Sequence, residues 1–226
     1  MQNIHLTEDG IRKKVASGIV ILGARRALVQ VIVTGSNIVL ARLLAPQIFG
    51  AFAIVSFLVL TPGILTSFGL APALIQKKGV VTKKQVQAIF TALFLASLVF
   101  VLAIFLLAPL ADVIYKGQLG SSGIFWLRTF SLVLLLTNLT TVSSSLLEKR
   151  LDYKKVTIGE LSILFLTQIS VIILALRGLG VGGFVLGNLI GSLFGFVFYF
   201  YLSPWPIGFN LSYRDLKGFL DRKSVV

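Results

Sequence analysis

The chain has 226 residues, of which 56% are hydrophobic and only 13% are charged, and its mean hydropathy is +0.95. Soluble domains carry about 45–50% apolar and about 25% charged residues, so this composition excludes an ordinary soluble domain. The net charge is +13. The basic residues nevertheless form short clusters between long apolar runs, which argues against nucleic-acid binding. There is no cysteine and a single histidine, His5, so we expect no disulfide, no metal site and no cofactor.

Six apolar stretches have the length of a membrane-spanning helix, which needs about 20 residues. They are residues 15–40, 51–74, 86–110, 124–147, 157–176 and 181–202. Backbone polar groups in lipid must be satisfied within the segment, so these stretches are predicted to be helices. The sequence therefore predicts an all-α integral membrane protein with about six transmembrane helices. Its parts are a cytoplasmic leader (1–14), a six-helix lobe (15–202) and a cytoplasmic tail (203–226).

The distribution of basic residues predicts the orientation of the chain in the membrane. With the N-terminus inside, fifteen Lys and Arg residues lie on the cytoplasmic side and three lie outside. The three outer residues are Arg42, Lys116 and Arg177. Cytoplasmic loops are enriched in Lys and Arg. We therefore expect a multi-pass protein of the cell (inner or plasma) membrane with both termini in the cytoplasm.

Two adjacent arginines interrupt the first apolar stretch. Arg25 and Arg26 lie about eleven residues into it, which at 1.5 Å per residue is near the bilayer centre. An ionisable residue at that depth costs about 2.5–3.5 kcal/mol on insertion scales and indicates a functional site. At helical spacing, Gln30, Thr34 and Asn37 share the side of Arg26. We predict that Arg26 faces a water-filled cavity, with Arg25 as a second candidate.

The alternative for Arg26 is a structural ion pair with another helix. Glu160, about one turn into the fifth stretch, is the acidic residue clearly within a span. Its depth, closer to the cytoplasmic face, argues against a direct pair with Arg26. Glu160 itself is either a proton or ion site or the partner of Lys154 or Lys155.

Polar residues in the fourth stretch have two interpretations. Asn138 shares one helix face with Ser131, Thr141 and Ser145, and this face either lines a cavity or forms hydrogen bonds between helices. Arg128 lies near the outer end of the stretch, where a long side chain can reach the interface.

The sixth stretch carries four glycines at a spacing of four residues. A stripe of this kind lets another helix approach closely, whether in the same chain or in a second copy. The glycines are Gly183, Gly187, Gly191 and Gly195.

Four segments in this order resemble a known family. They read ARLLAPQIFGAFAI, FGLAPALIQKK, SSLLEKRLDYKKVTIGEL and GVGGFVLGNLIGSLFGFVF. They are similar to the polysaccharide-biosynthesis flippases, the Wzx-type oligosaccharide exporters of the multidrug/oligosaccharidyl-lipid/polysaccharide superfamily. The resemblance covers nearly the whole chain, to about residue 220.

The resemblance implies a transporter, not an enzyme. Its substrate would be an undecaprenyl-pyrophosphate-linked oligosaccharide, moved to the outer leaflet by alternating access between two six-helix halves. Arg26 and Arg25 match the cationic residues of the family's central cavity and would meet pyrophosphate or sugar acids, with Gln30, Asn37 and Asn138 beside them. Such transporters are about twice as long. We therefore expect an N-terminal half that lacks its C-terminal lobe, or a half-transporter that dimerises among membrane lipids.

Three other functions remain open at this point. A multidrug exporter of the same superfamily would need acidic cavity residues, for which only Glu160 qualifies. A membrane glycosyltransferase would need carboxylates or histidines at a membrane face, whereas Glu148 and Asp152 lie among lysines as solvated charges would. A non-catalytic dimerising subunit is the third alternative.

Overall fold

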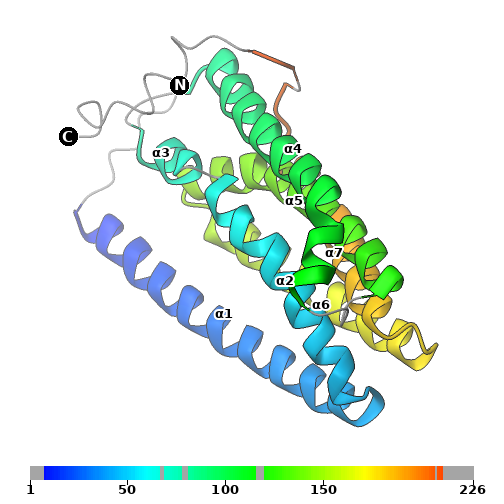
Figure 1. The fold of residues 1–226 in the computed structure, drawn as a ribbon. Coiled ribbons are helices and arrows are strands. Elements are labelled where there is room, and N and C mark those ends of the chain that lie inside the picture. The colour runs from blue at the N-terminus through cyan, green and yellow to red at the C-terminus, as the bar shows by residue number, and fades with distance from the viewer. Residues whose placement is uncertain (1–7, 67–68, 78–80, 116–119, 207, 211–226) are drawn as a thin grey trace.

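The computed structural model describes residues 8–66, 69–77, 81–115, 120–206 and 208–210. The described chain is helical and contains no strand, and six of its helices are long and apolar enough to cross a membrane (Figure 1). The helices are α1 (Glu8–Leu43), α2 (Pro46–Thr66), α3 (Leu70–Gln76), α4 (Lys83–Ile114), α5 (Gly120–Lys149), α6 (Tyr153–Leu176) and α7 (Val181–Leu202). The prediction of an all-α, multi-pass membrane protein is confirmed.

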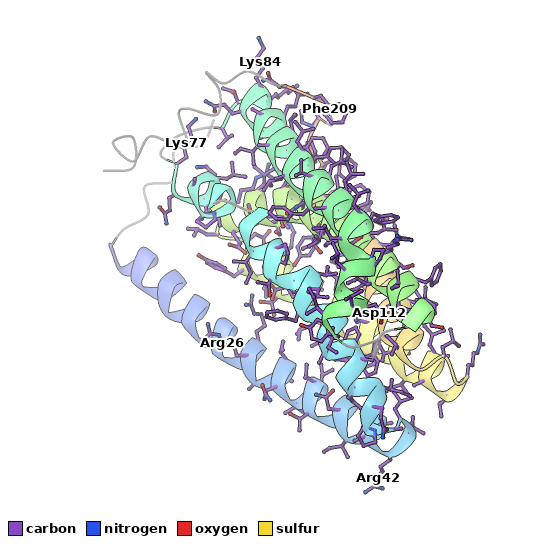
Figure 2. The ribbon with its side chains drawn as sticks, in the orientation of Figure 1. Arg26, Arg42, Lys77, Lys84, Asp112 and Phe209 are labelled. Carbon is purple, nitrogen blue, oxygen red and sulfur yellow. The ribbon has the colours of Figure 1, made fainter. Side chains whose placement is uncertain are left out.

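The two ends of the bundle differ in charge. Figure 2 shows Lys77 and Lys84 at one end, and Arg42 and Asp112 at the other. The first end also carries Lys149 at the end of α5, and we call it the basic end. The other is called the opposite end.

The centre of the bundle is α5, which packs against α4, α7, α2 and α3. Its side chains form an apolar core with those of α2, α4 and α7, around Phe130, Leu134, Val55, Val101 and Val185. Helix α6 packs against α7, and α1 packs against α6. The first helix therefore lies at the margin of the bundle, where Figure 1 shows it along one side.

The second predicted span, 51–74, is two helices in the structure. Gly69, between α2 and α3, adopts a left-handed conformation with φ of 72°, which glycine adopts without steric cost. Pro72 lies in the first turn of α3. Backbone N–H groups in a first turn have no acceptor within the helix, so the lack of an N–H in proline removes no helical hydrogen bond there. Pro62 lies inside α2 without ending it.

The chain after α7 packs back onto the bundle over the residues that the structure describes. Trp205 is buried, and its Nε1 donates to Ser143 Oγ on α5 at 3.1 Å. The backbone N–H of Asn210 donates to Thr91 Oγ1 on α4 at 2.9 Å. Phe209 lies beside the first turns of α4 (Figure 2). The predicted tail 203–226 therefore begins as a packed segment, and residues 211–226 lie outside the described residues.

Side-chain caps fix where two helices begin at the basic end. Thr82 and Gln85 form a capping box at the start of α4, each side chain bonding the other's backbone N–H. Asp152 caps α6 by accepting from the backbone N–H of Lys155 at 3.4 Å. α1 begins at Glu8, inside the predicted leader 1–14, and residues 1–7 lie outside the described residues.

Candidate functional site

An ion pair joins α1 to α6. Arg25 Nη1 lies 2.8 Å from Glu160 Oε2, and the side chains are 23% and 40% exposed. The expected alternative partner of Glu160, Lys155, pairs instead with Asp152 at 2.8 Å within its own first turn. The residue that the sequence ranked second, Arg25, is therefore the one that contacts the acidic group.

Arg25 and Glu160 lie at one level of the bundle. Arg25 is 18 residues from Leu43 at the opposite end of α1, a distance of about 27 Å along the axis. Glu160 is 16 residues from Leu176 at the same end of α6, or about 24 Å. The similar heights allow the ion pair, and the depth of Arg25 in the bilayer stays a prediction.

A second carboxylate belongs to the same region. Glu148, near the end of α5, is partly buried and lies within electrostatic range of both Arg25 and Glu160. Tyr199 of α7 borders the same region. Its hydroxyl donates to the carbonyl of Val156 on α6 at 2.8 Å. The sequence analysis interpreted Glu148 as a solvated charge among lysines. The signal for another role was its position one residue before the end of α5, in a long apolar helix.

The remaining polar residues of α1 lie on an uncovered face. Arg26, Gln30, Thr34 and Asn37 are all exposed, and Figure 2 shows Arg26 on α1. Gln30 Nε2 donates to Thr34 Oγ1 at 3.1 Å, one turn along the same helix. Within the described residues no other helix covers this stripe, which we call the α1 polar stripe. Polar groups at membrane depth are stable only against water, headgroups or another polar protein surface.

Comparison with known proteins decides the family. A family model described as polysaccharide biosynthesis protein matches residues 39–221. The chain belongs to this polysaccharide biosynthesis family. No curated protein and no solved structure matches it. The match begins after Arg25 and Arg26, so the role of the α1 arginines stays a prediction.

In this polysaccharide biosynthesis protein the glycine stripe of α7 packs against α6 of the same chain. A Cβ added at Gly187 would lie 2.9 Å from the backbone N of Val171, and one at Gly183 would lie 3.3 Å from the backbone N of Ala175. A Cβ added at Gly191 or Gly195 would instead meet the side chain of Thr167 or Ile163. Each step of four residues along α7 matches a step of four along antiparallel α6. The stripe serves a contact inside the lobe.

Arg128 of this family member has a partner within the bundle. Its Nε donates to the carbonyl of Phe105 on α4 at 3.1 Å, and its guanidinium lies 5.9 Å from the centre of the Phe105 ring. Pro109, four residues after Phe105, has no N–H to donate to that carbonyl. Arg128 therefore supplies the hydrogen bond that the proline removes, in addition to any contact with the interface.

Asn138 does not lie with the arginines of α1. It is buried on α5, and its Nδ2 donates to the carbonyl of Leu93 on α4 at 3.4 Å. Of the two interpretations of the fourth span, this contact favours hydrogen bonding between helices over a cavity wall.

Lys149 contributes a contact that the sequence did not indicate. Its Nζ donates to the carbonyls of Leu74 and Lys77, at and beyond the end of α3. A cation at a helix C-terminus satisfies carbonyls and complements the helix dipole. Lys149 thus fixes α3 to α5 at the basic end.

Proposed function

We propose that this protein translocates a lipid-linked oligosaccharide across the membrane during polysaccharide biosynthesis. Membership of the polysaccharide biosynthesis family and six candidate spans support a role in the synthesis or export of polysaccharide. We propose transport rather than catalysis as the form of that role. The substrate would be an oligosaccharide linked through pyrophosphate to undecaprenol.

The observation that carries the proposal is the cationic α1. Arg26 heads the exposed polar stripe, and Arg25 lies beside it in a partly exposed pair with Glu160. A pyrophosphate entering the low-dielectric membrane needs counter-charges, and arginine meets phosphate with several parallel donors. The two adjacent arginines of α1 would supply such counter-charges as the headgroup leaves water.

The membrane arrangement that we propose follows from the charges. The basic end would lie in the cytoplasm of the cell (inner or plasma) membrane, with both termini on that side. The α1 polar stripe would face a central cavity shared with a second six-helix unit. That unit would be either a C-terminal lobe or a second copy of this chain, and alternating access would occur between the two.

The test is the amount of surface polysaccharide in cells that depend on the protein. Arg26→Ala is expected to reduce export strongly, and Arg26→Lys to retain part of it, because lysine keeps the charge without the fork of donors. Arg42→Ala is the matched control, since Arg42 is an exposed arginine in the last turn of the same helix. Unchanged export in Arg26→Ala cells, at equal protein level in the membrane, would show that Arg26 has no such role.

A further inference from the structure

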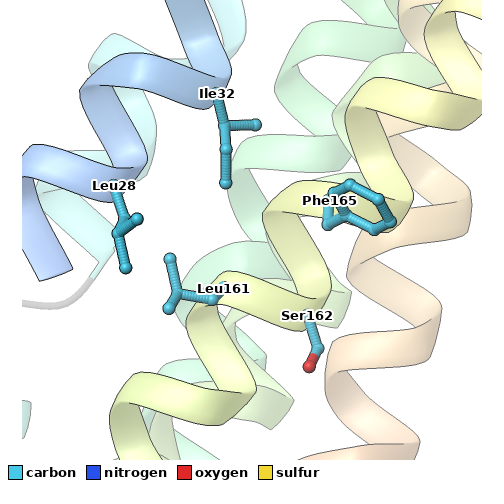
Figure 3. Close-up of a pocket in the computed structure, with 5 residues that line it drawn as sticks. All are labelled: Leu28, Ile32, Leu161, Ser162 and Phe165. Atoms are coloured by element: carbon cyan, nitrogen blue, oxygen red, sulfur yellow. The ribbon is translucent and has the colours of Figure 1, made fainter.

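The contact between α1 and α6 is interrupted in its middle. At the opposite end, Leu40 and Leu44 pack with Val171, Ala175 and Phe184. Nearer the basic end, the contact is the Arg25–Glu160 ion pair. Between them lies a hollow of about 280 Å³, lined by Leu28, Ile32, Leu161, Ser162 and Phe165. Figure 3 shows Leu28 and Leu161 facing each other across this space. We call it the α1/α6 hollow.

The lining suits hydrocarbon. Four of the five lining residues are apolar, and two of them remain largely exposed, Leu28 at 51% and Phe165 at 58%. The hollow therefore opens on the surface of the bundle. Pockets for whole small molecules measure about 300–1,000 Å³. A site of this size holds a length of chain, not a complete ligand.

The Arg25–Glu160 ion pair lies at one end of the hollow. Arg25, Leu28 and Ile32 follow one another at helical spacing on one face of α1, and Glu160 adjoins Leu161 on α6. The guanidinium of Arg25 has five donors, and its contact with Glu160 is made through Nη1. Arg25 is partly exposed and Arg26 is exposed beside it. This end of the hollow therefore offers guanidinium donors to an anionic headgroup, beside the carboxylates of Glu160 and Glu148.

A second hollow provides an internal comparison. It also measures about 280 Å³, and it lies among α5, α6 and α7. Its lining consists of Leu136, Leu174, Leu186, Leu189, Ile190 and Leu193. Both hollows can accept hydrocarbon, but of these two only the α1/α6 hollow has lining residues that adjoin an arginine–carboxylate pair.

We propose that the α1/α6 hollow binds the isoprenoid chain of the lipid-linked substrate, with Arg25 meeting its pyrophosphate. In this arrangement Glu160 holds the guanidinium at the mouth of the hollow, and the chain lies along Leu28, Ile32 and Leu161. The proposal rests on the proposed function for the identity of the lipid. It adds where the lipid chain lies while the headgroup is engaged.

The experiment measures binding of polyprenyl pyrophosphate to the full chain in lipid nanodiscs. Leu161→Trp fills the hollow and is expected to weaken binding about tenfold, a loss of about 1.4 kcal/mol. Leu161→Ala enlarges it and should leave binding within about twofold. Leu189→Trp fills the second hollow and is the matched control, with unchanged binding expected. Leu28→Trp, from the exposed wall on α1, repeats the test if Leu161→Trp lowers the yield of folded protein.

Three further probes separate the chain from the headgroup. Polyprenol without phosphate should bind more weakly than polyprenyl pyrophosphate and should still be lost in Leu161→Trp. Arg25→Gln should lower the affinity for polyprenyl pyrophosphate and leave that for polyprenol unchanged. Inorganic pyrophosphate should compete poorly, because it lacks the chain. Phosphatidylglycerol competing as well as polyprenyl pyrophosphate would overturn the proposal, since the hollow would then accept any anionic lipid.

The outcome is distinct from that of the export test. Binding of polyprenyl pyrophosphate that is unaffected by both Leu161→Trp and Leu28→Trp overturns the hollow as the chain site, even where Arg26→Ala abolishes export. Binding that depends on the hollow supports the proposal. If export nevertheless continues without the protein, the proposed function fails while the lipid site stands.

Discussion

Helix α6 packs mainly against α7 and α1, and these two contacts are built differently. Toward α7 it meets a stripe of glycines, and a Cβ added at Gly187 or Gly183 would lie within 3.3 Å of the α6 backbone. Toward α1 it meets an ion pair, an apolar contact at one end and a hollow between them. Two glycines of α1, Gly23 and Gly35, would place a Cβ in open space.

The difference separates a permanent contact from one that can change. Helices in lipid gain no hydrophobic driving force from association, so close packing and polar contacts decide how tightly they hold. The close packing of α6 and α7 cannot loosen gradually without losing many contacts together. The α1/α6 contact has fewer to lose, namely the Arg25–Glu160 pair and the apolar contact around Leu40. We therefore predict that the α1/α6 contact, which includes Arg25, changes more easily than the α6/α7 contact.

The largest expected effect is on the glycine contact. Gly187→Ala places a Cβ 2.9 Å from the backbone N and 3.1 Å from the Cα of Val171, so α6 and α7 must separate. Overpacking of this kind costs about 1–3 kcal/mol. Gly35→Ala is the matched control in α1 and should leave stability unchanged or raise it by up to about 1 kcal/mol. Thermal unfolding in detergent measures both, and equal effects would contradict the contrast between the two contacts.

The next largest effect concerns Arg128, and it tests whether its hydrogen bond to a backbone carbonyl stabilises the bundle. Arg128→Ala leaves the carbonyl of Phe105 without its donor, at an expected cost of about 1 kcal/mol. Pro109→Ala restores an N–H at that place. In the Pro109→Ala background, Arg128→Ala should therefore cost less. A double-mutant cycle of unfolding free energies measures the coupling, and additive losses would show that Arg128 does not compensate for the proline.

Breaking the Arg25–Glu160 pair is expected to change stability less than the substitutions above. It should nevertheless change the distance between α1 and α6. Partly exposed pairs contribute about 0–1 kcal/mol, so Arg25→Glu should change unfolding little. It should nevertheless release this part of α1 from α6. The chain has no cysteine, so Leu28→Cys with Leu161→Cys can be joined by a bifunctional maleimide without background.

Cross-linking across the hollow is expected to fall in Arg25→Glu. It should return in Arg25→Glu with Glu160→Arg, which reverses the pair and keeps the attraction. Glu160→Arg alone is the second single control. Equal cross-linking in all four proteins would mean that the ion pair does not hold α1.

The smallest effect concerns the start of α6, the helix that both contacts share. The hydrogen bond and charge of Lys155 lower the pKa of Asp152 below its ordinary value of 3.8. Since the folded pKa is below the unfolded one, the stabilisation is present above the ordinary pKa and is lost as pH falls through the lowered value. Asp152→Asn keeps a capping oxygen but removes the titration, so its unfolding temperature should depend less on pH between neutrality and acid. Parallel pH profiles would exclude this contribution.

Much of the fold could be predicted because a transmembrane helix is recognised by the length of its apolar run, without any periodic pattern. Residues 181–202 were predicted as a span and form α7 over the same range. The division of 51–74 into α2 and α3 was missed, because it depends on one left-handed glycine, Gly69, in an otherwise apolar run. The first helix is also longer than predicted, because α1 begins at Glu8 and the predicted span began at residue 15.

The candidate site was only partly accessible from the sequence. Arg25, Arg26 and Glu160 stand out because charge is costly in an apolar segment. The pairing of Arg25 with Glu160 depends on the lateral position and level of α1 against α6. Neither the lateral position nor the level of α1 can be predicted from the order of residues along the chain. The sequence left both a functional and a structural role open for Asn138 and Arg128, and each bonds a backbone carbonyl of α4.

The sequence by itself determined that this protein lies in a membrane, how many times it crosses, and which residues are too polar for lipid. Those properties follow from the length and composition of single segments, since each transmembrane helix satisfies its own backbone. The tertiary structure decided which of those polar residues meet one another and where α1 stands away from α6. Those properties depend on side-chain packing between helices distant in the chain, which no single segment encodes.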